Sequence, residues 1–279
     1  MDLARLMTAQ GPRYGVVDTD RRTVRPLRDP AGPEHLADLA QPTGSRGGAL
    51  TSGPSLAPEN ESVPLDEVRL LAPVVPGKIV VIGRNYGGRP DAAGNLIIHL
   101  KPTTSVVGPD DPIVLPDSSH DVRYEGELAV VIGRTCRSVA PEDAAHHVLG
   151  YTCANDVTAW DIGTDGGQWT KAKGMDTFCP LGPWISTDLD PAAALITTRV
   201  NGEIRQKGST AQLTRSALTL VSEISHLMTL LPGDVLLTGT PEGSAALTPH
   251  DTVSVDIDGI GTLRSPVVAT SNSRTTGQG

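Results

Sequence analysis

Aromatic side chains are scarce in this chain of 279 residues: Phe, Trp and Tyr make up 3%, with a single Phe. A surface that stacks nucleobases needs several exposed rings, so the sequence disfavours a single-strand binder. Basic residues are also outnumbered, with 23 Lys and Arg against 32 Asp and Glu and a formal net charge of -9. A general phosphate-backbone binder carries the opposite balance. We therefore expect no nucleic-acid partner.

Cysteine pairs and long apolar runs are missing as well. The three cysteines are Cys136, Cys153 and Cys179, and no CxxC pair occurs, which argues against a zinc ribbon or a disulfide framework. No run approaches the roughly 18 apolar residues of a membrane helix. The first residues, MDLARLMTAQGPRYG, lack the apolar core of a signal peptide. We expect reduced thiols, a cytoplasmic location and no membrane partner.

Glycine (30) and proline (23) are abundant and separate many short apolar runs. The runs predict strands near residues 14–18, 78–83, 95–100, 113–115, 127–132, 151–155, 195–200, 235–238, 252–257 and 261–263, and helical spacing predicts helices at 141–149 and 214–230. Regular strand–helix alternation is missing, so a mixed α+β, β-rich fold is expected rather than a doubly wound sheet. We expect a small N-terminal β domain over residues 1–68 with a flexible 41–61 segment, a body over 69–268, and a disordered tail over 269–279.

Three acidic residues mark the ends of two predicted strands. Glu125 and Glu127 lie within residues 124–128, where the predicted strand starts, and a spacing of two places both side chains on one strand face. Asp156 ends the next strand-like run, residues 150–156. Three carboxylates from two strand ends would form an oxygen site for a hard divalent cation. The bare spacing leaves open a pair of acids on a solvated strand face.

Two further segments carry candidate binding groups. Lys171 and Lys173 lie within residues 168–178, and a lysine beside a bound metal could hold a substrate carboxylate or stabilise an enolate. The segment TGTPEG at 238–243 follows a predicted strand, and the amides and hydroxyls around Gly239 and Thr240 could grip an anion. Surface lysines and an ordinary turn remain the alternative interpretations.

Several sequence blocks occur in one characteristic order. They are YEGELAVVIG at 124–133, GYTCAND at 150–156, DTFCPLGP at 176–183, NGEIRQ at 201–206, PGDVLLTGTPEG at 232–243 and GIGTL at 259–263. Together they resemble the fumarylacetoacetate hydrolase superfamily over residues 70–268. The resemblance implies a β-roll catalytic domain, a homodimer, and a divalent cation, with magnesium first and manganese or calcium as alternatives. It also implies a small-molecule substrate, a 2-oxo acid or a β-dicarbonyl compound.

The resemblance assigns roles to individual residues by position. Glu125, Glu127 and Asp156 match metal ligands, Lys173 matches a lysine that contacts substrate, and Thr240 lies in the Gly-Thr-Pro turn at the pocket. The implied chemistry is a metal-bound enolate, with the cation acting as a Lewis acid. Hydrolysis of C–C bonds, decarboxylation, keto–enol isomerisation and hydration all occur in the superfamily.

The segment after residue 83 departs from the superfamily pattern. Residues 83–92 read GRNYGGRPDA, which places Arg89 and Ala92 where members commonly carry a His and Glu dyad that activates water. Arginine stays protonated and cannot serve as a general base. The dyad is therefore absent from its usual place. Arg84 and Arg89 could instead bind a substrate carboxylate, beside Tyr86.

Further departures concern the substrate pocket. Trp160 and Gly163 stand where members often have Arg and Gln, which suggests a more apolar or differently shaped substrate. His99 stands where an aromatic residue is usual and shares a strand face with Lys101. We expect His99 to be either a relocated base or a structural histidine. The expected catalytic set is Lys173, Thr240 and His99, and the expected substrate-binding set is Arg84, Tyr86, Arg89, Lys101, Trp160 and Gly239.

Three hypotheses about function follow from these features. The first is a metal-dependent enzyme that performs decarboxylation, isomerisation or a ring-forming or ring-opening step in a specialised pathway. The second is an acylpyruvate-type C–C hydrolase whose water is activated by a relocated base such as His99. The third is a non-catalytic member that keeps the fold and the metal, which the retention of Lys173 and the carboxylates disfavours.

Overall fold

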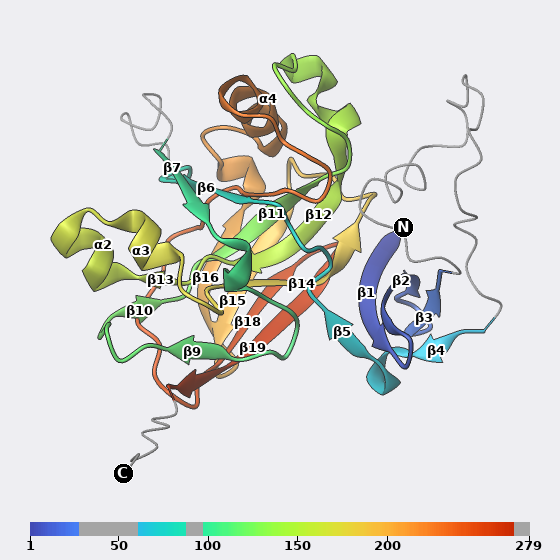
Figure 1. Cartoon of the computed structure of the whole chain (residues 1–279), viewed down its shortest axis with the longest axis horizontal. Helices are drawn as coiled ribbons and strands as arrows, with labels where there is room; N and C mark the ends of the chain where they lie inside the picture. The colour runs from blue at the N-terminus through green and yellow to red at the C-terminus, as the bar shows by residue number, and fades with distance from the viewer. Residues whose placement is uncertain (28–60, 88–96, 271–279) are drawn as a thin grey trace, which may run out of the picture.

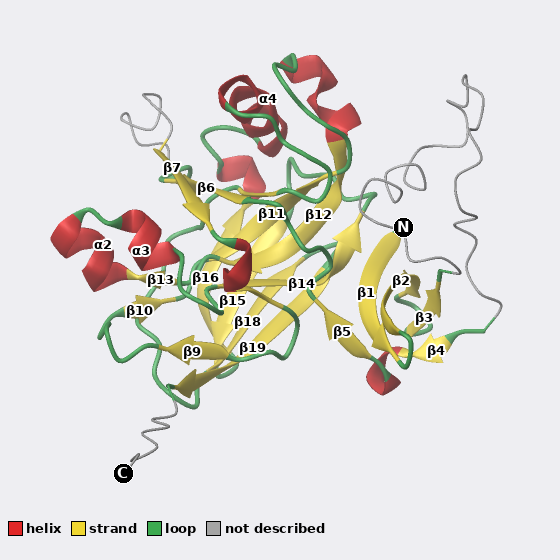
Figure 2. Ribbon diagram, viewed as in Figure 1, coloured by secondary structure: helices red, strands yellow, loops and turns green. Residues whose placement is uncertain are grey.

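Strands dominate the computed structural model, which describes residues 1–27, 61–87 and 97–270 (Figures 1 and 2). The strands of the N-terminal half are β1 (Asp2–Thr8), β2 (Gly11–Asp18), β3 (Thr23–Pro26), β4 (Val63–Pro64), β5 (Arg69–Leu71), β6 (Ile79–Gly83), β7 (Ile97–Lys101), β8 (Val106–Val107), β9 (Ile113–Leu115), β10 (Val122–Arg123) and β11 (Gly126–Ile132). Those of the C-terminal half are β12 (Val148–Asn155), β13 (Thr158–Ala159), β14 (Cys179–Ser186), β15 (Leu195–Val200), β16 (Glu203–Ser209), β17 (Val235–Leu237), β18 (Thr252–Ile257) and β19 (Gly261–Ala269).

The largest sheet has twelve strands and forms the centre of the molecule. Its main path is β4-β3-β2-β1-β14-β12-β11-β17-β6-β7, with β5 paired to β1 and β8 paired to β14. All residues of β11 are buried, and β6 is buried from Ile79 to Ile82. Such continuous apolar runs suit strands that are covered on both faces. The expected strand at 95–100 corresponds to β7, the edge strand beside β6.

A second sheet of five strands, in the order β16-β15-β18-β19-β9, packs on the first. The burial of β18 alternates residue by residue, as expected for a sheet with one face in the core. Ile196, Val255 and Leu263 of this sheet share a core with Leu128 and Val130 of β11. The hairpin between β15 and β16 turns at Asn201 and Gly202, both with positive φ, as the Asn-Gly sequence predicts. A third, two-stranded sheet joins β10 and β13.

The N-terminal strands join the sheet of the body. β1 pairs with β14, and Leu3 and Tyr14 share a core with Val81 and Val131. The division at residue 68 stays a prediction, and residues 41–60 of the expected flexible segment lie outside the described residues. At the other end, β19 extends through Ala269, one residue into the expected disordered tail, because its last residues pair with β9. Residues 271–279 lie outside the described part of the chain.

In the part of the chain that the structure describes, helices are few and short. They are α2 (Trp160–Gly166), α3 (Trp169–Lys173) and α4 (Ala217–Leu227), with 3-10 turns at Leu65–Glu67, Thr103–Ser105, Pro141–His147 and Thr210–Gln212. The expected helix at 214–230 corresponds to α4, which begins after the N-cap Ser216. The helical stretch expected at 141–149 is the 3-10 turn at Pro141–His147, which packs against α4.

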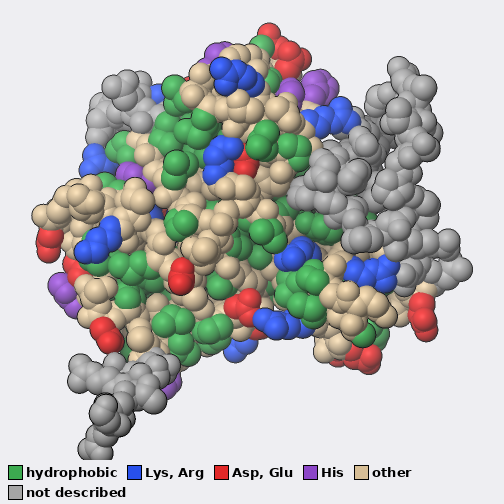
Figure 3. Space-filling model, viewed as in Figure 1, with side chains coloured by type: hydrophobic (Ala, Val, Ile, Leu, Met, Phe, Trp, Pro, Cys, Tyr) green, Lys and Arg blue, Asp and Glu red, His purple; other side chains and the backbone are tan. Residues whose placement is uncertain are grey.

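α2 and α3 lie side by side next to β10 and β13, and α3 also contacts β7 (Figure 1). In the described part of the chain no helix is long and apolar enough to cross a membrane. On the face seen in Figure 3, basic and acidic side chains are scattered among hydrophobic ones over the coloured area. Both helices contact β13, the short strand that follows β12, and this places them beside the candidate site.

Candidate metal centre and active site

Three carboxylates meet where β11 begins and β12 ends. β11 and β12 are antiparallel, and Gly126 lies opposite Asn155 in the register. Glu125 precedes β11, Glu127 lies in it, and Asp156 follows β12, so the pairing brings them together. One ligand atom from each lies within 4.8 Å of the others. The exposed fractions are only 7%, 1% and 1%, which excludes the solvated strand face that the spacing alone allowed.

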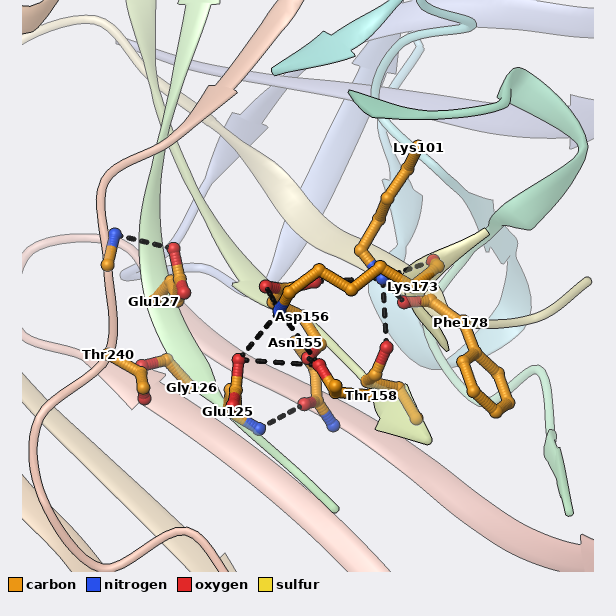
Figure 4. A network of polar contacts seen from close by, with 12 residues as sticks. Lys101, Glu125, Gly126, Glu127, Asn155, Asp156, Thr158, Lys173, Phe178 and Thr240 are labelled. Carbon is orange, nitrogen blue, oxygen red and sulfur yellow. Dashed lines mark hydrogen bonds and ion pairs between the residues drawn. The ribbon is translucent and has the colours of Figure 1, made fainter. Parts of the chain in front are cut away.

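Lys173 provides a positive charge at this site from the last residue of α3. Its Nζ donates hydrogen bonds to Glu125 Oε2 at 3.1 Å, to Thr158 Oγ1 at 2.8 Å and to Asp156 Oδ2 (Figure 4). The side chain is buried. Lys171, the other lysine of this helix, is exposed. The structure thus brings Lys173, and not Lys171, to the carboxylates.

Lys101 provides a second positive charge from β7. Its Nζ lies 2.8 Å from Asp156 Oδ1 and donates to the carbonyl oxygens of Val157, Lys173 and Phe178 at 2.9, 2.7 and 2.7 Å. Three carbonyls and one carboxylate surround an ammonium group with three hydrogens. The substrate contact expected for Lys101 stays a prediction. In the protein alone the side chain holds Asp156 and the end of α3 in place.

The turn after β17 holds the first residues of β11. Gly239 N donates to Glu127 Oε2 at 2.7 Å, and its φ of +107° lies in the region that favours glycine. Thr240 Oγ1 donates to the Gly126 carbonyl at 2.9 Å and accepts from Gln206 Nε2 at 2.8 Å. Gln206 Oε1 in turn accepts from Gly126 N at 3.0 Å. The Thr240 hydroxyl therefore orients the backbone between the two glutamates, and its catalytic role stays a prediction.

The charges at the site are unbalanced in the protein alone. Burial, followed by the neighbouring Asp156 charge, raises the pKa of Glu127 well above its ordinary value. Burial also raises the pKa of Glu125 to about 7, although Lys173 opposes it. Burial acts in the same direction on Asp156, but Lys101 and Lys173 outweigh it and lower its pKa to about 2. If all three carboxylates are ionised, they exceed the two ammonium groups by one negative charge, and together with burial this excess raises the pKa values of the two glutamates.

A divalent cation fits this donor set. Hard cations such as magnesium, manganese and calcium prefer carboxylate oxygens, and a bound cation would supply the missing positive charge. Glu125, Glu127 and Asp156 would hold it. The uncompensated charge is the structural observation that supports the metal, independently of the sequence pattern.

His99 and Tyr86 lie close enough to the site for the charges of Lys173 and Glu127 to act on their pKa values, and Trp160 is linked to His99 through Trp169. The His99 ring lies 5.5 Å from the Trp169 ring, and Trp169 lies 5.7 Å from Trp160, between centroids. Burial and the charge of Lys173 lower the pKa of His99. The Tyr86 hydroxyl is buried without a hydrogen-bond partner, and burial and the charge of Glu127 raise its pKa. His99 and Trp160 thus come together through Trp169.

The two arginines expected to bind substrate remain predictions. Arg84 is exposed and adopts a positive φ of 58° just after β6. Arg89 lies outside the described residues, as does Ala92.

Sequence reasoning missed three side chains that hold the site together. Gln206 links Gly126 to the turn at Thr240, and Thr158 accepts a hydrogen bond from Lys173. Asn85 ties the loop after β6 to two carbonyls, Thr238 O at 2.9 Å and Arg215 O at 3.0 Å. Gln206 and Asn85 lay within motifs that were noticed, but only their tertiary partners reveal their function.

Comparisons with known proteins agree with this geometry. A model of the family described as "Fumarylacetoacetate (FAA) hydrolase C-terminal" matches residues 78–268, and one described as "Rv2993c-like, N-terminal" matches residues 1–73. Protein Rv2993c of Mycobacterium tuberculosis is 50% identical over 217 residues, which cover 74% of this chain and 81% of that protein. The mitochondrial oxaloacetate tautomerase fahd2 of Xenopus laevis is 37% identical over 278 residues, with coverages of 92% and 86%.

Solved structures show the same relationship. The crystal structure of 5-carboxymethyl-2-hydroxymuconate delta-isomerase from Mycobacterium smegmatis superposes with a TM-score of 0.84 and 42% identity. The match covers 96% of this chain and all of that one. Fold, carboxylate site and sequence all agree, and the chain belongs to the fumarylacetoacetate hydrolase family.

Proposed function

We propose that this chain catalyses the metal-dependent keto–enol isomerisation of a 2-oxo acid or β-dicarbonyl acid. One observation carries the proposal. Glu125, Glu127 and Asp156 are buried with ligand atoms within 4.8 Å of one another, and Lys173 Nζ bonds two of these carboxylates. A site of this kind stabilises negative charge that develops on substrate oxygens. Such charge develops when a proton leaves the carbon beside a carbonyl group.

The residues of the chain have distinct roles in this proposal. A divalent cation, magnesium first, held by the three carboxylates would supply Lewis-acid stabilisation of that charge. Lys173 keeps its proton because Asp156 and Glu125 outweigh the effect of burial and raise its pKa. Its ammonium group can therefore orient a substrate carboxylate or carbonyl oxygen. Lys101 holds Asp156 in place, and Gly239 N holds Glu127.

Isomerisation is favoured over hydrolysis because it moves a proton and consumes no water. The water-activating dyad is missing from its usual place in the sequence, where Arg89 and Ala92 stand. The names of two similar proteins, an oxaloacetate tautomerase and a delta-isomerase, support the same reaction class. Decarboxylation and ring-forming or ring-opening steps share the same enolate chemistry, so product analysis must separate them.

Hydrolysis of a C–C bond is the second candidate, and His99 supports it. A His whose pKa is lowered by burial and by Lys173 is neutral near pH 7 and can accept a proton from water. This would make His99 the relocated base.

A homodimer and a cytoplasmic location are further proposals. Light scattering and fractionation test them.

The direct experiment incubates the purified protein with oxaloacetate and acetylpyruvate in ¹⁸O-labelled water, with magnesium, with manganese, or with EDTA. Products are identified by NMR and mass spectrometry. The proposal predicts metal-dependent interconversion of keto and enol forms with no new C–C cleavage. Cleavage with incorporation of labelled oxygen would favour the hydrolase instead, and the absence of any metal-dependent product would favour a non-catalytic member.

A further inference from the structure

Four side chains form a continuous row of ring–ring and cation–π contacts near the carboxylate site. The His99 and Trp169 rings are 5.5 Å apart and tilted by 32°, and the Trp169 and Trp160 rings meet edge to face at 5.7 Å. The guanidinium of Arg123 lies 4.8 Å from the centroid of the Trp160 ring. We call these four residues the aromatic ladder. The spacings are those of favourable aromatic and cation–π contacts.

Two elements, β7 and α3, connect the ladder to the carboxylate site. His99 and Lys101 lie two residues apart on β7, so they share a strand face. Trp169 and Lys173 lie four residues apart on α3, so they share a helix face. Both lysines contact Asp156. Each element therefore supplies one charged residue to the centre and one ring to the ladder.

A third element, β10, supplies the ladder residue Arg123. Arg123 lies two residues before Glu125 in the chain. Both Trp160 and Trp169 are half-buried, as is His99. The ladder thus runs from β10 to β7, and each of its three rings is partly exposed.

The missing side chain at Gly163 leaves room for the Trp169 ring of the ladder. A Cβ placed on Gly163 would lie 2.7 Å from Cζ3 and 2.8 Å from Cε3 of Trp169. Real Cβ contacts are not that short, so any other residue at 163 would displace the indole ring. Trp160 and Gly163 are three residues apart and on one face of α2. Together they seat Trp169 against His99.

The ladder provides three partly exposed rings, and its guanidinium group already has a carboxylate partner. Arg123 donates two hydrogen bonds to Asp121, at 2.8 and 2.6 Å, so its charge is already paired. Burial and the charges of Lys173 and Lys101 lower the pKa of His99, and the charge of Asp156 opposes them. The permanent cation among the four ladder residues, Arg123, already has a carboxylate partner, so a second substrate carboxylate would have to compete with Asp121 for it.

We propose that the aromatic ladder binds the part of the substrate that is remote from its oxo-acid head, and that this part is a planar, uncharged group such as an aryl ring or a conjugated chain. The proposal rests on the proposed function for the position of the head at the carboxylate site. It goes further, because it states which tails the chain selects. A carboxylate tail is disfavoured, and a small alkyl tail leaves the ladder without a partner.

The test compares three acids with the same 2-oxo-acid head: benzoylpyruvate, acetylpyruvate and oxaloacetate. Binding is measured by titration calorimetry with the magnesium-loaded protein. We expect benzoylpyruvate to bind at least tenfold more tightly than the other two. Trp184→Phe removes the one tryptophan outside the ladder. In that variant benzoylpyruvate must quench the remaining fluorescence, which comes from Trp160 and Trp169.

Variants then locate the selectivity. Gly163→Ala and Trp169→Leu should reduce the preference for benzoylpyruvate over acetylpyruvate to threefold or less, and Trp169→Phe should restore most of it. Magnesium affinity and melting temperature report whether each variant is folded. Equal binding of the three acids by the unmodified chain, tightest binding of oxaloacetate, or no binding of benzoylpyruvate would overturn the proposal.

Turnover separates this inference from the proposed function. Isomerisation of all three acids with equal kcat/KM would leave the function standing and refute the ladder. Selective binding of benzoylpyruvate without metal-dependent isomerisation of any acid would support the ladder and refute the function.

Discussion

Lys101 Nζ lies 2.8 Å from Asp156 Oδ1, while Lys173 bonds the other oxygen of the same carboxylate. Asp156 is therefore held from two sides by groups that come from β7 and α3. Lys101 is 2% exposed and also satisfies three carbonyl oxygens. The two lysines fix the position of Asp156, one of the three proposed metal ligands, in the metal-free protein.

Lys101→Met should destabilise the protein by about 3–5 kcal/mol, because it leaves a buried carboxylate and three carbonyls without their partner. Denaturant unfolding of the EDTA-treated protein measures the loss. Lys171→Met is the matched control, since Lys171 is exposed on α3, and it should change stability by less than about 0.5 kcal/mol. A loss below about 1 kcal/mol for Lys101→Met would contradict the positioning role.

Glu127→Gln should weaken magnesium binding by at least about tenfold, which corresponds to about 1.4 kcal/mol. The amide oxygen can still accept the Gly239 N–H, so the change removes mainly charge. Titration calorimetry with magnesium measures the affinity. Glu242→Gln serves as the control, because Glu242 is exposed on the same turn. Unchanged affinity in Glu127→Gln would remove this residue from the metal site.

The metal-free protein should lose stability as pH rises from about 4.5 to 7. The folded protein raises the pKa of Glu125 from 4.5 to about 7, so in this window it binds more protons than the unfolded chain. The loss attributable to Glu125 is about 3 kcal/mol at most. Asp156, with its lowered pKa, acts in the opposite direction and below this window.

Melting temperatures between pH 5 and 8 in EDTA test this dependence. Glu125→Gln should flatten the profile, and saturating magnesium should raise the melting temperature most at the upper end. A metal-free protein that becomes more stable from pH 5 to 7 would show that the carboxylates are compensated in another way.

His99→Ala distinguishes the two candidate reactions. With oxaloacetate, whose tail is not expected to use the ladder, isomerisation should stay within about threefold of the unmodified chain. If His99 is a general base for hydrolysis, kcat should fall by about 10²–10⁴. His250→Ala is the control, since His250 is exposed in the turn at residues 249–250. A loss of that size in isomerisation would make His99 part of the proposed reaction.

The grouping of the three carboxylates could be predicted from the sequence because strand spacing and the family resemblance pointed to the same residues, although the spacing alone left a solvated strand face open. A spacing of two puts Glu125 and Glu127 on one strand face, and Asp156 ends the strand that pairs with theirs. The strand-rich fold followed from short apolar runs between Gly and Pro. The Asn201-Gly202 turn followed from its type I′ preference.

The rest depends on tertiary contacts that no local pattern encodes. Lys101 became a positioning residue only because β7 lies beside α3 and its ammonium group reaches Phe178 O. Trp160 and Gly163 were noticed as departures, but Trp169, which joins them to His99, was not singled out. Its seat against Gly163 depends on how α2 and α3 pack, and this packing is visible only in three dimensions.

Deuterium exchange at C3 of 2-oxobutanoate is the most direct test of the central claim, that the carboxylate site with Lys173 promotes loss of a proton beside a carbonyl group. This acid has no bond that hydrolysis or decarboxylation of a β-carboxylate could break, so exchange in D₂O followed by NMR reports enolisation alone. We predict exchange at least about a hundredfold faster with the magnesium-loaded protein than with EDTA, and a loss of about 10²–10³ in Lys173→Ala. Exchange at the buffer rate, while calorimetry shows that 2-oxobutanoate binds the magnesium-loaded protein, would contradict the claim.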